Sequence, residues 1–576
     1  CPPGQRPNPN SRADGLTNAV GAGRRNNNSM KIRGITFLAA LLATTLAGTV
    51  TAEDKPPTLT GMFPQGACRG SSVAVTVSGE LTSWPLSCWI CDDRERETNL
   101  VCKTMEAKGK LTITVPADAQ AGVYWLRLYN KDGASSPRPF LVSELPDTLE
   151  KEPNNSAKDA PLLEKSGILV HGRLEKKGDV DSYAVELEAG DLLVADLLAS
   201  RILASPMDGT LQITSSAGFV LAENDDDQGM DPRLIFRAPR KARYIIRIFS
   251  FPSKPNSSIQ FSGTAAHIYR LALTTGPFID RAYPLAAALA GPAEIRLEGW
   301  NIPAAKKLVK LQAAAVRGPQ LLRIPGSINA VPVERDDFLS ITEEDSQASG
   351  KLPVFKETMV ISGMINSPGE RDSYVFTSPD GKIVEVSVLA RSLGSLLDPV
   401  IKILDDASKT VSEKDDSEGG LDCSTRFTPA ANKPYRIELG DRFSHGGPRF
   451  FYMLRIGLPA RDFSLKLESA SFVLEKGKKL ELPVTVERHG GYDGKIVITA
   501  ADLPKGVRST TVESLNGKDS AKAVKLVLES EGAALGSPFR ITGSSDLESS
   551  ARKWAGFQVP GRKTRFTKPW LTVRGG

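Results

Sequence analysis

The sequence has few of the residues and motifs from which enzyme active sites are commonly built. It contains four histidines in 576 residues (His171, His267, His445 and His489), and none belongs to an H-E-x-x-H motif. It has no G-x-S-x-G nucleophile elbow and no Gly-Thr-Ser-Met-Ala segment around a serine. His267 is expected in a strand and His445 in a loop. The sequence therefore predicts no catalytic residue, and we expect a protein that is not an enzyme.

Beyond the N-terminus the sequence has almost no net positive charge. The formal net charge is +6, but residues 1–52 hold six basic residues against the single acid Asp14, which leaves the rest of the chain close to neutral. Proteins that bind nucleic acids usually present a basic face or stripe. We therefore expect no nucleic-acid partner.

Long apolar runs are also rare, and the clearest lies near the N-terminus. From Met30, "MKIRGITFLAALLATTLAGTVTA" has two cations, an apolar run from Ile35 to Gly48 and small residues ending at Ala52. This is the pattern of a secretory signal, and a run of about 14 residues is short for a membrane span. We predict a signal peptide at 30–52, a disordered start extension at 1–29, and a secreted, periplasmic or cell-surface protein without a transmembrane or lipid anchor.

Helical periodicity is hard to find, whereas alternation of apolar and polar residues is common. Examples are "SVAVTVSG" from Ser72, "KLTITVPA" from Lys110 and "VYWLRLYN" from Val123. A period of two indicates half-buried strands. With a length that suggests about three to five domains, the pattern predicts an all-β fold of tandem β-sandwich modules, immunoglobulin-like and jelly-roll, with no large helical domain.

The chain repeats itself. "GDVDSYAVEL" from Gly178 returns as "GERDSYVFTS" from Gly369, and three further blocks follow each copy in the same order. A fainter similarity precedes each copy, between "FPQGACRGSSVAVTVSG" from Phe63 and "YPLAAALAGPAEIRLEGWNI" from Tyr283. The order predicts an A-B-A-B tandem followed by a different C-terminal unit.

The repeated units resemble known families. Unit B is similar to the bacterial pre-peptidase C-terminal (PPC) domain through "EPNNSA" from Glu152, "GDVDSY" from Gly178, "ENDDD" from Glu223 and "YRLALTTGP" from Tyr269. Unit A resembles IPT/TIG-type immunoglobulin-like domains, and "GKIVITAADLPKGV" from Gly494 resembles a further immunoglobulin-like sandwich. The expected domains are 57–145 (IPT/TIG-like, with four cysteines), 146–277 (PPC-like), 278–340 (truncated IPT/TIG-like), 341–460 (PPC-like) and 461–576 (immunoglobulin-like).

The PPC resemblance implies a metal site. In calcium-binding members the linker that enters the sandwich supplies oxygens, and an Asp-rich turn supplies more. Carried onto this sequence, the implied ligands are Glu150, Glu152, Asn154, Asn155, Asp179 and Asp181. Calcium takes six to eight oxygens, so these six residues suffice for a structural ion. The alternative is an ordinary polar turn, in which Asn and Asp bond neighbouring backbone groups.

The second B unit departs from this pattern. Asp372 and Tyr374 match Asp181 and Tyr183, but Glu370 replaces Asp179 and Arg371 stands where Val180 was. A cation beside a dication site is unfavourable. We therefore expect calcium in the first copy and a metal-free second copy.

Cysteines are few and clustered. Cys68, Cys88, Cys91 and Cys102 lie in the first A unit, whereas Cys423 stands alone. In an exported domain four such cysteines predict two disulfides, with three pairings open. The alternative is zinc, because Cys88 and Cys91 have the spacing of half a zinc site. Cys423 is expected to be a buried free thiol or a strand-edge residue.

Together these features predict an exported, non-catalytic binding or scaffold protein of the cell envelope or exterior, with a calcium-stiffened linker between modules. Its partner would be a protein or polysaccharide at the cell surface. Two alternatives stay open. One is an accessory or remnant protein of a secreted serine peptidase, since PPC domains typically accompany such enzymes, and the other is an array of polysaccharide-binding modules.

Overall fold

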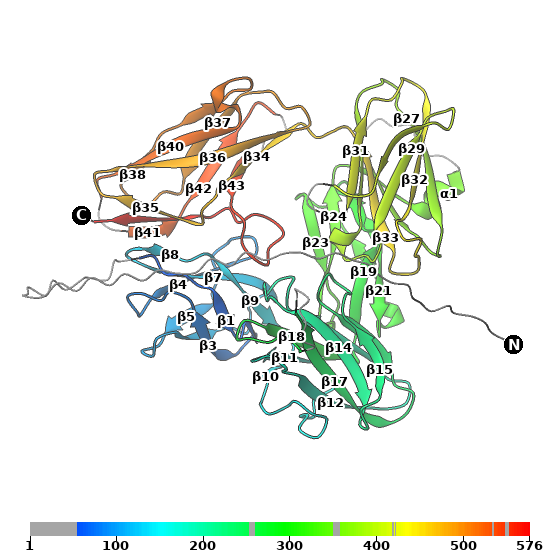
Figure 1. Ribbon diagram of the computed structural model, residues 1–576. Helices are drawn as coiled ribbons and strands as arrows, with labels where there is room; N and C mark the ends of the chain where they lie inside the picture. Colours follow the sequence, from blue (N-terminus) through cyan, green and yellow to red (C-terminus); the bar gives the residue numbers. More distant parts are fainter. Residues whose placement is uncertain are drawn as a thin grey trace, which may run out of the picture. The chain divides into compact units, whose positions relative to one another are not determined.

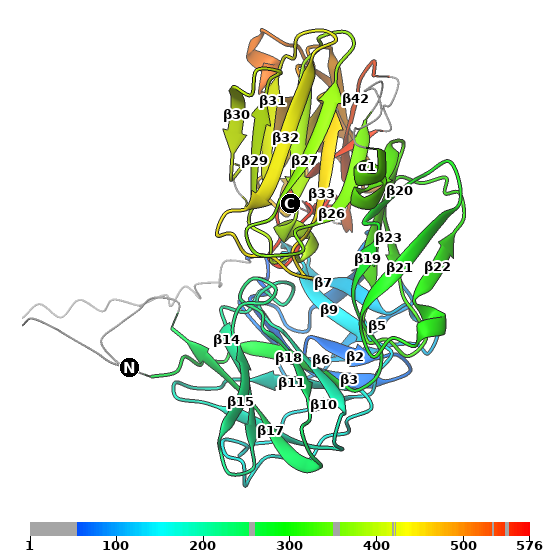
Figure 2. The same cartoon turned by 90° about the vertical axis from the view of Figure 1, so that its right-hand side faces the viewer.

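The computed structural model describes residues 55–252, 260–349, 358–417, 420, 422–532, 535–547 and 552–575. The predicted signal peptide and start extension lie outside these residues. The described chain consists of short strands, one helix, α1 (Glu343–Ser349), and the 3-10 turns η1 (Ala304–Lys306), η2 (Arg391–Leu393) and η3 (Asp519–Ala521) (Figures 1 and 2). The prediction of an all-β fold without a large helical domain is confirmed.

The first module contains two sheets, in the orders β1-β3-β6-β5 and β2-β9-β7-β4, with β8 beside β7. Apolar and polar residues alternate along its strands, and the apolar ones form the core. In "SVAVTVS", for example, Val75 and Val77 are buried, while the Thr between them and the Ser after them are exposed. Its strands are β1 (Gly61–Phe63), β2 (Gly66–Cys68), β3 (Ser72–Ser78), β4 (Ser87–Asp92), β5 (Val101–Thr104), β6 (Lys110–Thr114), β7 (Gly122–Asn130), β8 (Gly133–Ala134) and β9 (Arg138–Ser143).

The second module has a five-stranded sheet, β10-β11-β18-β13-β16, and a four-stranded sheet, β12-β17-β14-β15. Residues of both sheets, such as Val170 and Tyr183, share one buried core. The strands are β10 (Asp147–Leu149), β11 (Ile168–Arg173), β12 (Asp181–Leu187), β13 (Leu192–Leu198), β14 (Asp208–Ser215), β15 (Val220–Asn224), β16 (Arg233–Arg237), β17 (Ala242–Phe251) and β18 (Ile268–Thr274).

The third module is smaller, with two three-stranded sheets, β19-β21-β22 and β20-β24-β23. Ile279 and Val333, one from each sheet, meet in its core. The strands are β19 (Phe278–Tyr283), β20 (Ala286–Ala288), β21 (Ala293–Trp300), β22 (Leu308–Leu311), β23 (Gly318–Leu322) and β24 (Val331–Asp336).

The fourth module repeats the topology of the second. Its sheets run β25-β26-β33-β28-β31 and β27-β32-β29-β30, and β25 pairs in parallel with β26 as β10 does with β11. The strands are β25 (Leu339–Thr342), β26 (Met359–Met364), β27 (Arg371–Thr377), β28 (Val384–Leu389), β29 (Pro399–Leu404), β30 (Thr410–Lys414), β31 (Cys423–Phe427), β32 (Pro434–Asp441) and β33 (Phe451–Gly457).

The fifth module has an eight-stranded sheet, β38-β40-β36-β34-β43-β42-β37-β39, and a three-stranded sheet, β35-β44-β41. The strands are β34 (Asp462–Lys466), β35 (Ser471–Glu475), β36 (Lys479–His489), β37 (Ile496–Ala501), β38 (Val507–Ser509), β39 (Val512–Ser514), β40 (Ala523–Ser530), β41 (Leu535–Pro538), β42 (Arg540–Ser544), β43 (Lys553–Gly556) and β44 (Trp570–Arg574).

The first and fifth modules share buried residues, since Cys91 and Trp125 join the core cluster of the fifth. Arg127 is fully enclosed there, with its guanidinium 5.5 Å from the ring centre of Trp89 and 5.8 Å from that of Trp570. Contacts of this kind combine burial of apolar surface with cation–π attraction. The two ends of the described chain are therefore packed against each other.

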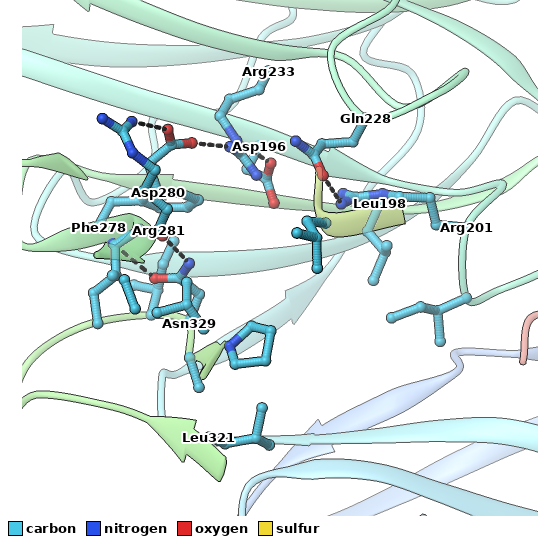
Figure 3. A pocket seen from close by; sticks show the side chains of 18 of the residues that line it. Asp196, Leu198, Arg201, Gln228, Arg233, Phe278, Asp280, Arg281, Leu321 and Asn329 are labelled. Atoms are coloured by element: carbon cyan, nitrogen blue, oxygen red, sulfur yellow. Dashed lines mark hydrogen bonds and ion pairs between the residues drawn. The ribbon is translucent and has the colours of Figure 1, made fainter. Parts of the chain in front are cut away.

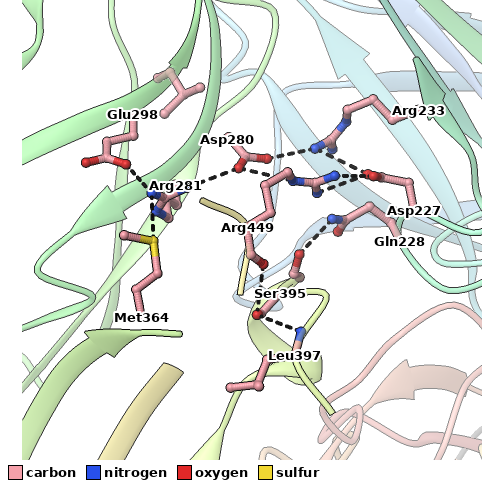
Figure 4. A network of polar contacts seen from close by, with 12 residues as sticks. Asp227, Gln228, Arg233, Asp280, Arg281, Glu298, Met364, Ser395, Leu397 and Arg449 are labelled. Atoms are coloured by element: carbon pink, nitrogen blue, oxygen red, sulfur yellow. Dashed lines mark hydrogen bonds and ion pairs between the residues drawn. The ribbon is translucent and has the colours of Figure 1, made fainter. Parts of the chain in front are cut away.

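A network of ion pairs links the second, third and fourth modules (Figure 4). Arg449, just before β33, donates to Asp227, which follows β15, at 3.1 Å. Arg233 on β16 pairs with Asp280 on β19 at 3.1 Å. All four side chains are largely buried, so each charge depends on its partner to offset the cost of removing it from water. No helix in the described part of the chain has the length and apolar character needed to cross a membrane.

Candidate functional site

The most concentrated group of predicted ligands lies where the linker enters the second module. The parallel pairing of β10 with β11 carries Glu150 to the end of β11. There its backbone N–H donates to the carbonyl of His171 at 3.0 Å, and its carboxylate accepts the N–H of Arg173 at 2.7 Å. Strand pairing thus fixes the start of the linker "EKEPNNS".

The Asp-rich turn reaches the same place from the other sheet. Gly178, with φ of 81°, begins the turn, and Asp181 is the first residue of β12. Asp179 accepts the N–H of Glu175 at 2.6 Å, and both aspartates are almost fully buried. A positive φ is easily adopted by glycine, which explains its place before the two acids.

Linker and turn converge on one cluster. Carboxylate oxygens of Glu152, Asp179 and Asp181 all lie within 4.8 Å of one another. Three like charges this close disfavour simultaneous ionisation unless a cation compensates them. Because two of these groups are buried, solvent screens them poorly.

Asn154 adds the observation that points most directly to a ligand. Its side chain is fully buried, yet neither its amide oxygen nor its amide nitrogen has a hydrogen-bond partner, and one oxygen of Asp181 is also unpartnered. The N–H of Ser182 bonds the Asn154 carbonyl at 2.9 Å, which holds Asn154 beside the start of β12. Buried polar groups are rarely left unpaired, because each costs about 1–3 kcal/mol. A bound cation would satisfy these oxygens.

The two remaining predicted ligands have different surroundings. Burial raises the pKa of the Glu150 and Asp181 carboxyls, and the charge of Asp181 raises that of Glu150 further, so both groups hold their protons to higher pH than ordinary acids. Asn155 is exposed, and its amide nitrogen donates to Asp179 at 3.4 Å. Asn155 therefore lies at the edge of the cluster, and its nitrogen, not its oxygen, faces Asp179.

Sequence reasoning missed a buried tyrosine pair beneath the cluster. The hydroxyl of Tyr269 donates to Asp181 at 2.5 Å, and the hydroxyls of Tyr183 and Tyr269 lie 2.6 Å apart. Burial raises the pKa of both tyrosines well above its ordinary value, so both remain neutral donors. The repeat offered a way to find them, because tyrosines occupy the matching positions of the second copy.

The fourth module holds a similar cluster that was not expected. Glu343, Glu370 and Asp372 have carboxylate oxygens within 4.8 Å of one another. Glu343 accepts the N–H of Met364 at 3.0 Å, as Glu150 accepts that of Arg173. Tyr452 donates to Asp372 at 2.5 Å.

Arg371 does not lie in this cluster, although it follows Glu370 in the sequence. Arg371 is exposed while its neighbour Asp372 is buried, because adjacent strand residues point to opposite faces. A different contrast remains between the copies. Among the described residues of the fourth module, no buried amide side chain lacks a partner as Asn154 does. The prediction of a metal-free second copy stays a prediction.

The donors of the first cluster fit a hard cation. All are oxygens from carboxylates or an amide, which is the ligand chemistry of calcium, and thiol and imidazole groups are absent from the cluster. Glu152, Asn154, Asp179 and Asp181 are the residues that would hold the ion.

The cysteines separate into two groups by strand geometry. Cys88 and Cys102 hydrogen-bond each other and pack against the core of the first module, whereas Cys91 faces the fifth module. Cys68 lies apart, near Asp147 and Arg69. None of the described cysteines is in a disulfide. The prediction of two disulfides stays a prediction, and Cys88 and Cys102 are the pair whose side chains are in contact.

The zinc alternative fails for a related reason. Cys88 and Cys91 are three residues apart on β4, so their side chains point to opposite faces of the strand and do not converge on one ion. Cys423 is buried and free, in agreement with one of the two expectations for it.

The histidines make ordinary contacts. His171 is buried beside Asp147 at 3.2 Å, His267 bonds the Thr264 hydroxyl at 2.8 Å, and His445 is exposed. His489 lies 3.0 Å from the Ser464 hydroxyl, but the nearby carboxylate, Glu487, contacts the serine and not the imidazole. Among the described residues, no carboxylate contacts the His489 imidazole as the orienting acid of a catalytic triad would.

Comparison with known proteins gives limited similarity. No family model matches the chain. A probable subtilase-type serine protease from Deinococcus radiodurans is 29% identical over 143 residues, which is 25% of this chain and 18% of that protein. The chain thus covers less than a fifth of the length of this relative.

Two solved structures illustrate how weak the structural similarity is. The insect immune protein hemolin aligns with 91% of this chain and 100% of its own at 10% identity and a TM-score of 0.23. Bacteroides ovatus SGBP-B, in complex with a mixed-linkage heptasaccharide, aligns with 68% of this chain and 72% of its own at 8% identity and a TM-score of 0.13. Overlap this poor identifies neither a related fold nor a function.

Proposed function

We propose that the chain is an exported, non-catalytic binding or scaffold protein in which a calcium ion fixes the linker into the second module. The single observation that carries this proposal is the fully buried, unpartnered amide of Asn154 beside three converging carboxylates. A cation supplies the positive charge that this group of acids lacks. Without it, the oxygens of Asn154 and Asp181 remain unsatisfied.

A calcium ion at this site would join two separate segments of the chain. Glu152 and Asn154 belong to the linker, whereas Asp179 and Asp181 belong to the turn that opens β12. Binding would hold the linker against the sandwich and so restrict the angle between the first and second modules. Metal binding that joins separate segments couples directly to their order. A defined angle suits a protein that presents several binding surfaces at once.

The family assignments belong to the same proposal. We assign the second and fourth modules to the PPC type and the first and third to the IPT/TIG type. In support, the second and fourth modules share strand order in both sheets and repeat the contact between a tyrosine and a buried aspartate. The similarity to a subtilase-type protease fits proteins in which such domains accompany a peptidase.

Export and partners are part of the proposal too. Calcium sites of extracellular modules work with dissociation constants of about 10⁻⁴ to 10⁻³ M, which matches the calcium level outside cells better than that inside. We propose a protein or polysaccharide partner at the cell surface. The second candidate is an accessory or remnant of a secreted serine peptidase, which the protease similarity favours.

Thermal unfolding in calcium and in EGTA tests the proposal. Calcium at ten to a hundred times the dissociation constant should stabilise the folded protein by about 1.4–2.7 kcal/mol. Asn154→Ala should reduce this gain, because it removes one buried ligand and so weakens calcium binding, while Asn155→Ala should keep it. Equal melting of the wild type in calcium and EGTA contradicts the proposal.

Casein hydrolysis with and without phenylmethylsulfonyl fluoride tests the non-catalytic part of the proposal. A non-catalytic protein leaves casein intact under both conditions. Cleavage that the inhibitor blocks would make the chain a serine peptidase, whatever the outcome of the calcium experiment.

A further inference from the structure

A cavity of about 630 Å³ lies on the outer face of the five-stranded sheet of the second module (Figure 3). Alternation along β18 places Tyr269, Leu271 and Leu273 in the module's own core. Arg270 and Ala272 point the other way and line the cavity. The third, fourth and fifth modules supply its other walls. Its volume is typical of sites that enclose a small organic molecule.

The walls are mainly apolar. Hydrocarbon side chains from three modules face the space, namely Leu169, Leu198, Ile202, Leu285, Leu321 and Phe451. The exposed fraction of Leu321 is 68%, so part of this apolar surface is open to solvent. A molecule with a hydrocarbon body would gain free energy by covering it.

Most of the cations at this cavity already have acidic partners. Arg233 pairs with Asp196 at 2.7 Å and with Asp280 at 3.1 Å. Arg201 pairs with the buried Asp231 at 2.8 Å, and Arg281 pairs with Glu298 (Figure 4). These ion pairs leave little net charge for a ligand, and the pair of Arg233 with Asp280 also joins the second module to the third.

Arg270 is different. Only 8% of it is exposed, it forms no ion pair among the described residues, and its Nε and Nη2 have no hydrogen-bond partner. Burial lowers its pKa to about 10, although Asp147 counteracts this shift. Asp147 is itself hydrogen-bonded to His171. A buried guanidinium without a partner is costly, and an anion is what it lacks.

Two further cations line this cavity or the smaller one beside it. Lys563, at the rim, donates to the carbonyl of Ser392 at 2.7 Å, and burial lowers its pKa. Arg323 shares with Arg270 a smaller adjoining cavity of about 160 Å³ and has no ion pair within the described chain. These two cations add positive potential to the walls of the two cavities that Arg270 lines.

We propose that this cavity binds an amphipathic monocarboxylate, whose carboxylate pairs with the guanidinium of Arg270 and whose hydrocarbon body covers the apolar wall. Arginine suits this role because its planar fork matches a carboxylate. Glu334, which also lines the cavity, opposes an anion and should limit the affinity. The proposal does not depend on the calcium site.

Calorimetric titration of the whole protein with decanoate and with decanol tests the proposal. Decanoate should bind with saturation, and decanol, which lacks the charge, should bind at least tenfold more weakly. Arg270→Met should weaken decanoate binding about tenfold or more, whereas Arg94→Gln, at an exposed position, should leave it unchanged. Equal affinity of the wild type and Arg270→Met, equal affinity for the two ligands, or no binding of decanoate overturns the proposal.

Melting measurements exclude a merely structural role. Removing an uncompensated buried cation should leave the melting temperature of Arg270→Met unchanged or raise it. If that variant melts lower, Glu334→Gln decides. Tighter decanoate binding by Glu334→Gln at unchanged melting temperature supports the anion site, and unchanged affinity overturns it.

Discussion

The hydroxyl of Tyr269 donates a hydrogen bond to the buried carboxylate of Asp181 at 2.5 Å, directly below the candidate calcium site. Tyr452 makes the same contact with Asp372 in the fourth module. The hydroxyl of a second tyrosine lies beside the first in each copy. The repeat thus preserves a buried polar network as well as a strand order.

Tyr269→Phe and Tyr452→Phe should each destabilise the protein. The change removes the donor from a buried carboxylate, and hydrogen bonds to charged groups contribute about 1.5–3 kcal/mol. Urea unfolding should show this loss in both variants. Tyr124→Phe is the matched control, because its hydroxyl donates to a backbone carbonyl and should cost less. A loss no larger than that of the control would show that the contact is not stabilising.

The carboxyl pair of the fourth module makes stability depend on pH. Burial raises the pKa of Glu343 to about 7 and that of Asp372 to about 6. In the unfolded chain both values return to about 4. Between these limits the folded state binds more protons than the unfolded state, so stability falls as pH rises from about 4 to about 7.

Glu343→Gln should reduce this loss. A glutamine side chain can still donate a hydrogen bond towards Asp372 but carries no charge. The free energy of unfolding of the variant should therefore exceed that of the wild type by about 1–2 kcal/mol at pH 8 and differ little from it at pH 4. Urea midpoints at the two pH values measure the difference. Glu164→Gln, at an exposed position, should behave as the wild type. An equal change in both variants would rule out the buried pair as the cause.

Glu95 should be essential for docking of the fifth module on the first. Its carboxylate accepts Arg562 at 2.8 Å and both the N–H and the hydroxyl of Thr567. Glu95→Ala removes the nearer acidic partner of the buried Arg562 and leaves only Asp93, at 3.7 Å, which should cost about 3 kcal/mol. Hydrogen exchange of residues 557–574 should rise in this variant and not in the exposed Glu106→Ala. Unchanged exchange would show that Glu95 does not hold the modules together.

Cys88 and Cys102 should form a disulfide when the protein is oxidised. Their side chains are in contact, and closing this short loop should stabilise the fold by about 3 kcal/mol. Peptide mapping without reductant should find this link and a free Cys91. A link between Cys88 and Cys91 would contradict the placement of these side chains on opposite faces of β4.

Local patterns predicted much of the fold. Alternation in "SVAVTVSG" correctly indicated a strand, and the repeat from Gly178 to Gly369 corresponds to two modules with equal topology. Both features can be recognised in the sequence alone. Alternation of apolar and polar residues reflects strand geometry, and the repeat is found by comparing one segment of the sequence with another. What they did not predict is how the modules meet.

Only part of the candidate site could be predicted from the sequence. Glu152, Asp179 and Asp181 were expected, and the structure brings them together. Tyr269 and Glu343 were missed, since each is distant in sequence from the aspartate that it approaches. The placement of the cysteines was out of reach for the same reason. Spacing cannot show that Cys88 and Cys91 face different cores.

Calcium titration by calorimetry, on the whole protein and on Glu152→Ala/Asp181→Ala, tests the central claim most directly. The account predicts one saturable site with a dissociation constant of about 10⁻⁴ to 10⁻³ M that the double variant loses. Asn154→Ala should weaken it, and Asn155→Ala should not. Absence of binding at millimolar calcium, or equal binding by the double variant, would contradict the claim that "EKEPNNS" is a calcium clamp.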